Sequence, residues 1–240
     1  MIKISQFEKN IQKEISNLVN VSVKYKDIQI VSNEKYENKK RITVYQMKFN
    51  SLIITAPSLY NSIKDVVSSM GEKSKIYIDQ LKNLLNLNDH KVTNKTIYLF
   101  LNPIDFKDSF LESRYKLSRL NEGYNTEFEK FKSECSKKDL DEALVSLEDP
   151  VVYGCFFKDK LIGVTSYWFW EERIADIGVV VHPKYRQQGV GQVLVAKLCK
   201  WGIDHNIINL YRHDETNKNS SLLAVSLNFK EHFFVEDISL

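Results

Sequence analysis

Two glycines separated by a single residue stand at the start of a predicted helix, and they are the feature of this sequence best suited to bind a ligand. They stand in the segment Arg186-Gln187-Gln188-Gly189-Val190-Gly191, which follows an uninterrupted valine strand and Pro183. Apolar residues then recur at helical spacing, so a helix is predicted to begin near Gly189. The first N–H groups of a helix have no partner within it, and glycines let an anion approach them closely. The segment therefore predicts a phosphate-binding loop, to which Arg186 could add a charge-assisted hydrogen bond.

The spacing of the glycines separates three kinds of phosphate loop. A Walker loop ends in Gly-Lys-Ser/Thr, which is absent here. A dinucleotide-binding loop has a third glycine at the position that Leu194 occupies. The pattern that remains is Arg/Gln-x-x-Gly-x-Gly. An ordinary strand, turn and helix with no ligand is the alternative interpretation.

The segment, with its valine strand and His182-Pro183, closely resembles the coenzyme A loop of the GNAT acyltransferase superfamily. The resemblance continues downstream, where Asn217 and Ser220 reproduce an Asn-x-x-Ser pattern of that family. Asn228 stands where the family usually has the glycine of Leu-Gly-Phe, and asparagine is the next-best residue for a left-handed helix C-cap. The resemblance covers roughly residues 106–240.

This resemblance implies acetyl-CoA as the acyl donor and an unidentified primary amine as the acceptor. Acetyl-CoA is a substrate in this reaction, and no metal is expected. The valines would act through their main-chain groups. The residues that the resemblance assigns to acetyl-CoA binding are Val179, Val180, Val181, Arg186, Gln187, Gln188, Gly189, Val190, Gly191, Asn217 and Ser220.

The implied reaction is direct attack of the amine on the thioester, and it needs a base because a protonated amine is not a nucleophile. In the family the base is frequently a carboxylate on the strand that leads into the loop, and Asp176 is an isolated acid there. Asp176 is therefore the candidate base or water-positioning residue, and a structural role in the sheet is the alternative. The family's oxyanion donor is often a backbone amide at a strand bulge, which Gly178 would permit.

The departing thiolate must be protonated, and the sequence offers only a weak candidate for the acid that does so. The tyrosine that often serves as the acid in the family corresponds to Ala224 here. Tyr211 is a weaker candidate acid, a water could replace it, and ordinary strand packing is the other interpretation of Tyr211. Three rival functions stay open: a transferase with another acyl donor or acceptor, a non-catalytic acyl-CoA-binding sensor, and an interaction module without coenzyme A.

The elements around the loop predict an α/β (α+β) fold, with a GNAT-like mixed sheet flanked by helices in residues 106–240. Strands are expected at 150–157, 161–170, 174–181 and 207–211, with two short helices near 128–135 and 138–147 before the first of them. Residues 1–105 predict a separate, smaller α/β domain of unknown role. Its expected elements are helices over 4–19, 58–70 and 73–87 and strands at 21–25, 28–30, 42–49, 52–55 and 96–101. This domain is expected either to shape the acceptor site or to form an oligomer contact, such as that of a homodimer.

Composition and charge narrow the partners. The net charge is +3 with the two signs interspersed, so no nucleic-acid partner is expected. The three cysteines share no close spacing, which argues against disulfides and structural zinc. No apolar stretch approaches the ~20 residues that span a membrane, and the N-terminus lacks the apolar core of a signal peptide. A cytoplasmic location without membrane contact is therefore expected.

Overall fold

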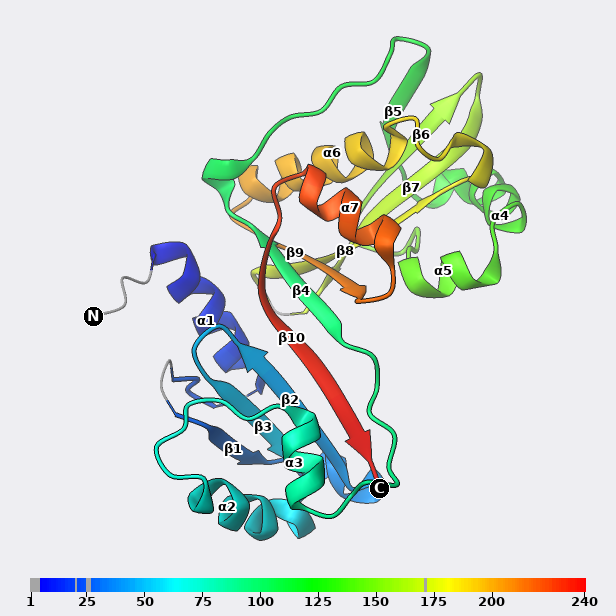
Figure 1. The fold of residues 1–240 in the computed structure, drawn as a ribbon. Helices are drawn as coiled ribbons and strands as arrows, with labels where there is room; N and C mark the ends of the chain where they lie inside the picture. Colours follow the sequence, from blue (N-terminus) through cyan, green and yellow to red (C-terminus); the bar gives the residue numbers. More distant parts are fainter. Residues whose placement is uncertain (1–4, 20, 25–26, 171) are drawn as a thin grey trace. The chain divides into compact units, whose positions relative to one another are not determined.

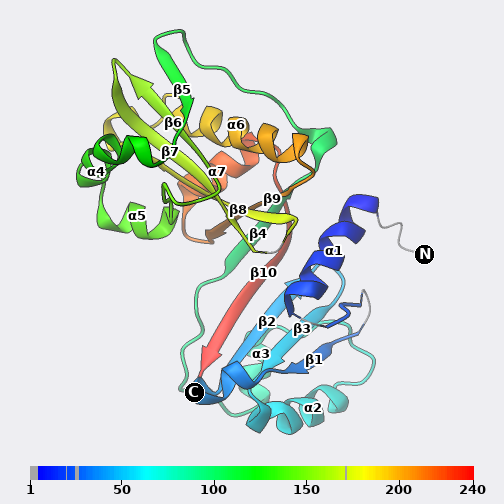
Figure 2. The same cartoon turned by 180° about the vertical axis from the view of Figure 1, so that it is seen from behind.

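The computed structural model describes residues 5–19, 21–24, 27–170 and 172–240. By their contacts, the residues divide into two compact units (Figures 1 and 2). The first unit comprises residues 1–99, 213–218 and 231–240, and the second comprises residues 100–212 and 219–230. A division of the chain at residue 105 stays a prediction, since the first unit also takes in two later segments.

The first unit contains a sheet that takes one of its strands, β10, from the end of the chain. Strand β3 (Ser51–Thr55) lies between β1 (Gln29–Ser32), which is parallel to it, and β2 (Arg41–Met47), which is antiparallel. Strand β10 (Lys230–Ser239) pairs antiparallel with the other side of β2. The last strand therefore completes a sheet that begins near residue 29.

Helices cover both faces of this sheet. Helix α1 (Gln6–Val19) lies on one face, and α2 (Tyr60–Ser69) and α3 (Ile78–Leu84) lie on the other (Figures 1 and 2). Strand β4 (Thr96–Leu101) follows α3 along the chain. The core under α2 and α3 takes residues from the strands, from both helices and from β10: Ile42, Val44, Ile53, Ile63, Ile76, Ile78, Leu81 and Ile238.

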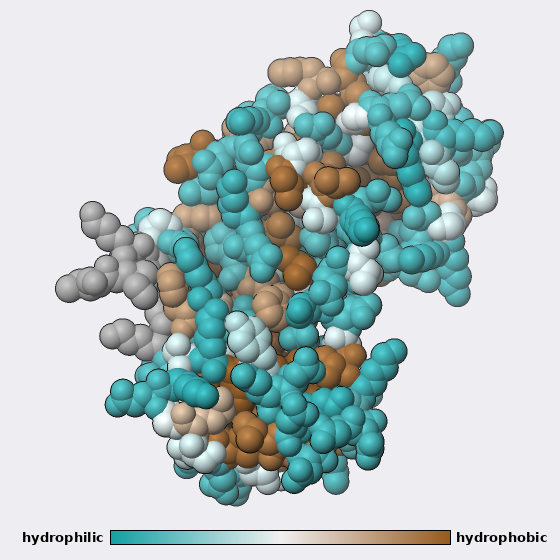
Figure 3. Space-filling view, in the orientation of Figure 1, coloured by the Kyte–Doolittle hydropathy of each residue, from teal (hydrophilic) through white to brown (hydrophobic). Residues whose placement is uncertain are grey.

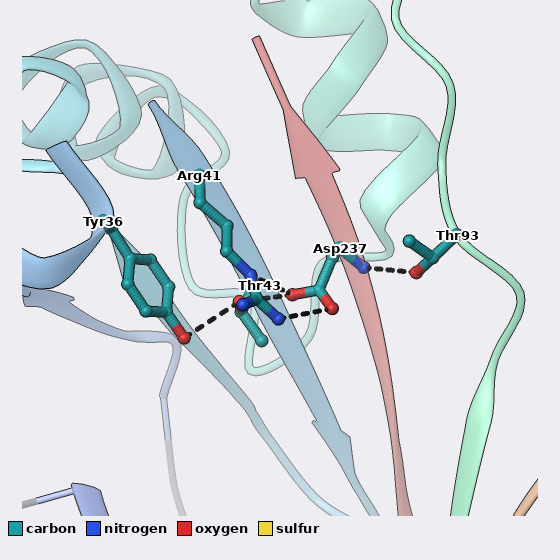
Figure 4. Close-up of polar contacts among 5 residues, drawn as sticks. All are labelled: Tyr36, Arg41, Thr43, Thr93 and Asp237. Carbon is teal, nitrogen blue, oxygen red and sulfur yellow. Dashed lines mark hydrogen bonds and ion pairs between the residues drawn. The ribbon is translucent and has the colours of Figure 1, made fainter. Parts of the chain in front are cut away.

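Polar side chains also join β10 to β2 in this unit (Figure 4). Arg41 donates to Asp237 from Nε at 3.0 Å and from Nη2 at 2.7 Å. The Thr43 hydroxyl donates to the same carboxylate, and the backbone N–H of Asp237 donates to the Thr93 hydroxyl at 2.9 Å. A bidentate arginine–carboxylate pair of this kind fixes geometry as well as adding energy.

The second unit contains an antiparallel sheet extended by one parallel strand. Its strands β5 (Tyr115–Arg119), β6 (Val151–Phe157), β7 (Lys160–Phe169) and β8 (Ile174–Val181) pair antiparallel in this order, and β9 (Ile208–Asp214) pairs parallel with β8. Helices α4 (Asn125–Ser133) and α5 (Lys137–Ala143) cover one face, and α6 (Val190–Asp204) and α7 (Lys218–Ser226) cover the other (Figures 1 and 2). The predicted mixed α/β fold, with a sheet flanked by helices, is confirmed.

Strands β8 and β9 pair over a short stretch and then part. Their register joins Ile174 to Ile208, Ala175 to Asn209 and Asp176 to Leu210, and it ends there. On its other side β8 stays paired with β7 as far as Val181. The main chain of residues 177–181 therefore keeps one neighbouring strand and leaves its β9 side outside the ladder, just before the loop.

The bulge expected at Gly178 is absent from the pairing of β8 with β7, because that register passes through Gly178 without a shift. Glycine is needed there for another reason. A Cβ on Gly178 would overlap the carbonyl oxygen of Ala143, at the end of α5. The glycine therefore allows α5 to lie directly against β8.

Candidate functional site

The loop between β8 and α6 presents the beginning of a helix. A 3₁₀ turn, Pro183–Tyr185, follows β8, and α6 begins at Val190 with Gly189 as its N-cap. No side chain caps this helix start. The N–H groups of its first turn have no acceptor within the helix, and the positive end of the helix dipole lies there. The arrangement suits an anion such as a diphosphate.

The two glycines of the loop differ in what the protein's own conformation requires of them. Gly189 has a φ of +79°, a left-handed conformation that is costly for other residues. Gly191 has no such constraint, and a Cβ added there would lie 3.5 Å from both Leu223 and Val181, an ordinary packing distance. The packing of the protein therefore leaves room for a methyl group at position 191.

Two polar side chains of the loop are engaged with the protein. The Arg186 guanidinium donates from Nε to the Val181 carbonyl at 3.1 Å and forms an ion pair with Asp139 at 2.8 Å. Gln188 accepts from the Tyr115 hydroxyl at 2.9 Å and donates to the Lys184 carbonyl at 3.0 Å. Gln187 is exposed and has a φ of +60°. The main chain of the loop is thus held in place by its own side chains.

Asp176 is the last residue of β8 that pairs with β9, and it is buried, with 7% of its surface exposed. It is not isolated, as the sequence alone suggested, because Arg212 of β9 donates to it from Nε at 2.7 Å and also from Nη2. The Arg212 guanidinium lies over the Trp170 ring, 4.6 Å from its centre. Burial raises the pKa of Asp176, while the charge and hydrogen bonds of Arg212 oppose that rise.

A comparison with known protein families gives a match that includes this strand and the glycine-rich helix start. Residues 117–229 match the model of the acetyltransferase (GNAT) family. These residues form a GNAT domain.

Solved structures share the fold of the GNAT domain. An acetyltransferase of the GNAT family from Colwellia psychrerythraea is 14% identical, with a TM-score of 0.53, over 78% of this chain and 76% of that one. A GCN5-related N-acetyltransferase-like protein from Streptococcus suis is 13% identical, with a TM-score of 0.50, over 84% of each chain. At these identities the similarity is one of fold alone.

A third solved structure matches over a smaller share of both chains. It is a protein assigned to the GNAT family from Novosphingobium aromaticivorans, 15% identical over 62% of this chain, with a TM-score of 0.47. This chain spans 64% of the length of that protein. No curated protein matches this chain.

Tyr211, the weaker candidate acid, lies on the other face of the GNAT domain's sheet from Asp176. Asp176 is level with Leu210, so the next residue of β9 points the opposite way. Tyr211 is 2% exposed and packs edge-on against Phe229 at 5.5 Å. Burial raises the pKa of Tyr211 to about 12, against a hydrogen bond with Ser220. The structure therefore joins Tyr211 to Ser220 by a hydrogen bond.

Asn217 groups by its contacts with the first unit, whereas Ser220 belongs to the second. The backbone N–H of Asn217 donates to the Asp214 carbonyl at 2.9 Å. Asn228 has a φ of +64°, as expected for a left-handed residue after α7. Its amide donates to the Asp105 carbonyl at 2.9 Å. A role for Asn217 in cofactor binding stays a prediction.

Arg212 is the residue of this site that the sequence did not reveal. The strand predicted over 207–211 ended one residue before it, whereas β9 continues to Asp214. Alternation along the longer strand would have placed Arg212 on the same face as Leu210. Its contact with Asp176 depends on the register between two strands, which sequence spacing does not give.

Three further observations concern the apolar surface, membrane-crossing helices and metal-binding groups. On the face shown in Figure 3, apolar side chains come to the surface over α7, where Leu222 and Val225 are exposed. Across the described part of the chain, no helix combines the length and the apolar composition needed to cross a bilayer. The same residues contain no group of three or more His, Cys, Asp or Glu side chains that could hold a metal ion.

Proposed function

We propose that the GNAT domain transfers an acetyl group from acetyl-CoA to a primary amine by direct attack. The observation that carries this proposal is the position of the glycine-rich start of α6, immediately after the segment of β8 that has parted from β9. A long ligand with a diphosphate could lie along that strand and end at the helix start. Acetyl-CoA has this form.

The binding roles follow from the groups that each residue offers. The main-chain groups of Val179, Val180 and Val181 would meet the pantetheine arm, because they lie where β8 has no partner in β9. The N–H groups from Gln187 to Gly191 would meet the diphosphate. Ser220 and Asn217 are proposed as further contacts, on the resemblance of their sequence to the family.

In the proposed reaction the amine nitrogen attacks the thioester carbonyl carbon, and the carbon–sulfur bond breaks. The coenzyme A sulfur leaves with the electron pair and takes up a proton, while the amine loses one. Asp176 is the candidate base, which Arg212 holds in place. Tyr211 stays the weaker candidate acid, and a water is the alternative, because Tyr211 faces away from Asp176.

A non-catalytic acyl-CoA sensor is the second candidate function. Two observations favour it: the buried Ala224 stands where the family often has its tyrosine, and Asp176 is already paired with Arg212. A transferase with another acyl donor or acceptor would use the same loop. The acceptor, the cytoplasmic location and a homodimer remain expectations from the sequence.

An assay for the coenzyme A thiol tests the proposal and separates the candidates. Acetyl-CoA is mixed with the protein and a panel of amines that includes polyamines, aminoglycosides and lysine peptides. The enzyme releases thiol when the right amine is present, and an Asp176→Asn variant that binds acetyl-CoA normally should be slower by about 10²- to 10⁴-fold if Asp176 is the base. Binding without release for every amine would favour the sensor, and an absence of binding would reject both.

A further inference from the structure

The side chain of Arg186 is directed toward the protein that surrounds the loop. Its Nε donates to the carbonyl of Val181, the last residue of β8, and its Nη2 lies 2.8 Å from an oxygen of Asp139 on α5. The Ser136 hydroxyl donates to Asp139 as well, and the backbone N–H of Asp139 donates to Ser136 at 3.1 Å. Arg186 therefore joins the strand end, the loop and the capped first turn of α5.

A second tie joins the same parts. His182 is 4% exposed, and its Nδ1 accepts from the Lys184 N–H at 3.1 Å. Its Nε2 then carries the proton, which is donated to Glu134 at 2.8 Å. Glu134 follows α4 and also pairs with Lys160. Two acidic residues, one at the end of α4 and one in α5, thus hold the two ends of the 3₁₀ turn before the glycines.

An arginine beside a phosphate loop has two possible tasks, and they leave different contacts. A phosphate ligand would direct its guanidinium toward the first turn of α6. A positioning residue would be occupied by the protein, with a carbonyl on one side and a carboxylate on the other. The Arg186 contacts with Val181 and Asp139 are of the second kind.

We propose that Arg186 is a positioning residue, which fixes the loop by joining Val181 to Asp139, and that α5 thereby sets the loop conformation that receives the diphosphate. This inference rests on the proposed function, because it concerns the same acetyl-CoA loop. It assigns to the backbone, and not to the Arg186 side chain, the direct contact with the diphosphate. Asp139, an acidic residue, then supports the binding of an anion.

The sign of that effect makes the inference testable. If Arg186 bound the diphosphate directly, removal of the Asp139 charge would leave the arginine more available and the site more positive, so acetyl-CoA would bind more tightly. If Arg186 acts through Asp139, Asp139→Asn should weaken binding. The ion pair is partly exposed, with side-chain exposures of 39% and 30%, so its loss should raise the dissociation constant only modestly, by roughly twofold to fivefold.

The experiment is a double-mutant cycle in the full chain, with acetyl-CoA as the ligand in titration calorimetry. Asp139→Asn and Arg186→Gln should weaken binding by similar factors, and the double variant should be no weaker than either single variant. Glu142→Gln is the matched control, because it removes the same charge from the same helix, from a residue paired with Lys138. It should change the affinity by less than about twofold.

Tighter or unchanged binding by Asp139→Asn, together with weaker binding by Arg186→Gln, would overturn the proposal in favour of a direct ligand. Additive losses in the double variant would overturn it as well. Thermal unfolding without ligand is measured for the wild type, the two single variants and the double variant. This measurement keeps the test independent of the proposed function. Coupling between the two substitutions in unfolding supports the tie even if acetyl-CoA does not bind, and its absence removes the tie.

Discussion

Gly191 is the residue at which packing and ligand binding make opposite demands. Inside a helix, glycine is less favourable than alanine by about 1 kcal/mol, and the protein has room for a methyl group at this position. A glycine that the protein's own packing does not require is explained if something outside the protein must approach the backbone. Gly189 differs, because its φ of +79° alone accounts for its identity.

The first prediction concerns bulk at this position. Gly191→Ala should leave the thermal midpoint of unfolding within a few degrees of the wild type, because its Cβ lies at ordinary packing distances. Gly191→Val adds further bulk at the same position. It should weaken acetyl-CoA binding by at least about tenfold, since its methyl groups block the approach to the helix start. Gly191→Ala controls for folding, and calorimetry measures the affinity. Wild-type affinity in the valine variant would reject the loop assignment.

The second prediction concerns the buried pair between Asp176 and Arg212. Removing one partner leaves the other charge buried without compensation, so Arg212→Met should lower the free energy of unfolding by about 3–5 kcal/mol. Adding Asp176→Asn to that variant should restore part of the loss, since the uncompensated charge is gone. Urea unfolding of the wild type, both single variants and the double variant measures the coupling. Simple additivity would show that the two residues do not depend on each other.

The sequence predicted which residues belong to the site better than it predicted the contacts between them. The glycines and the valine strand were visible from their spacing, and Asp176 from the resemblance to the family. The pairing of Asp176 with Arg212 was not, because it requires the parallel register of β8 and β9. The ion pair between Arg186 and Asp139 could not be predicted either. It depends on the tertiary packing of α5 beside the loop, and the two residues are far apart in the sequence.

Among the elements, those specified by local pattern were predicted best. Strands β6, β7 and β8 were expected at nearly their observed bounds, and the loop ended where α6 was expected to begin. Less regular segments were mispredicted. The helix expected over 73–87 is confined to α3, and residues 21–24 of the strand expected at 21–25 are not in a strand, while residue 25 lies outside the described residues.

The third prediction concerns the tie between α5 and the loop at low pH. Partial burial acts to raise the pKa of Asp139, but hydrogen bonds from Ser136 and Arg186 outweigh it and hold that pKa below its ordinary value of 3.8. A carboxylate with a lowered pKa stabilises the fold above its unfolded pKa, and this contribution is lost as the pH falls through the folded value. The stability difference between wild type and Asp139→Asn should therefore be constant above about pH 5 and shrink below pH 3.8. Urea unfolding at a series of pH values checks this, and a difference that grows on acidification would contradict it.

The fourth prediction concerns the attachment of β10 to β2 (Figure 4). Asp237→Ala removes the acceptor of Arg41 and Thr43, so it should lower the free energy of unfolding by about 1–3 kcal/mol. Glu231→Gln is the control, because it changes an exposed acid on the same strand. Urea unfolding measures both. Equal stability of the two variants would mean that the cluster contributes nothing to holding the strand.

At the scale of the whole molecule, the end of the chain belongs to the same unit as its beginning, because residues 231–240 group with residues 1–99. Arg41 and Asp237 are 196 positions apart, yet they belong to neighbouring strands. Sequence patterns describe neighbours along the chain. They could indicate a domain boundary near residue 105, but they could not indicate that the last strand pairs with β2 in the first unit. The same connectivity means that a segment cut at residue 105 would lack β10 and Ile238 of the first core.

The fifth prediction concerns that segment. Residues 1–105 alone should show no cooperative thermal unfolding, because the sheet edge of β2 and part of the core are left uncovered. Addition of a peptide that spans residues 229–240 should restore some structure. Circular dichroism measures both. Cooperative unfolding of the segment without the peptide would establish residues 1–105 as an independent domain.

The central claim is that main-chain N–H groups at the start of α6 hold the diphosphate of acetyl-CoA. The most direct measurement is a titration of ¹⁵N-labelled protein followed by the amide signals of Gly189 and Gly191, with acetyl-pantetheine as the ligand that lacks the diphosphate. The account predicts that both glycine signals shift saturably with acetyl-CoA and stay in place with acetyl-pantetheine. Saturable binding of acetyl-CoA that leaves both glycine signals unmoved would contradict it.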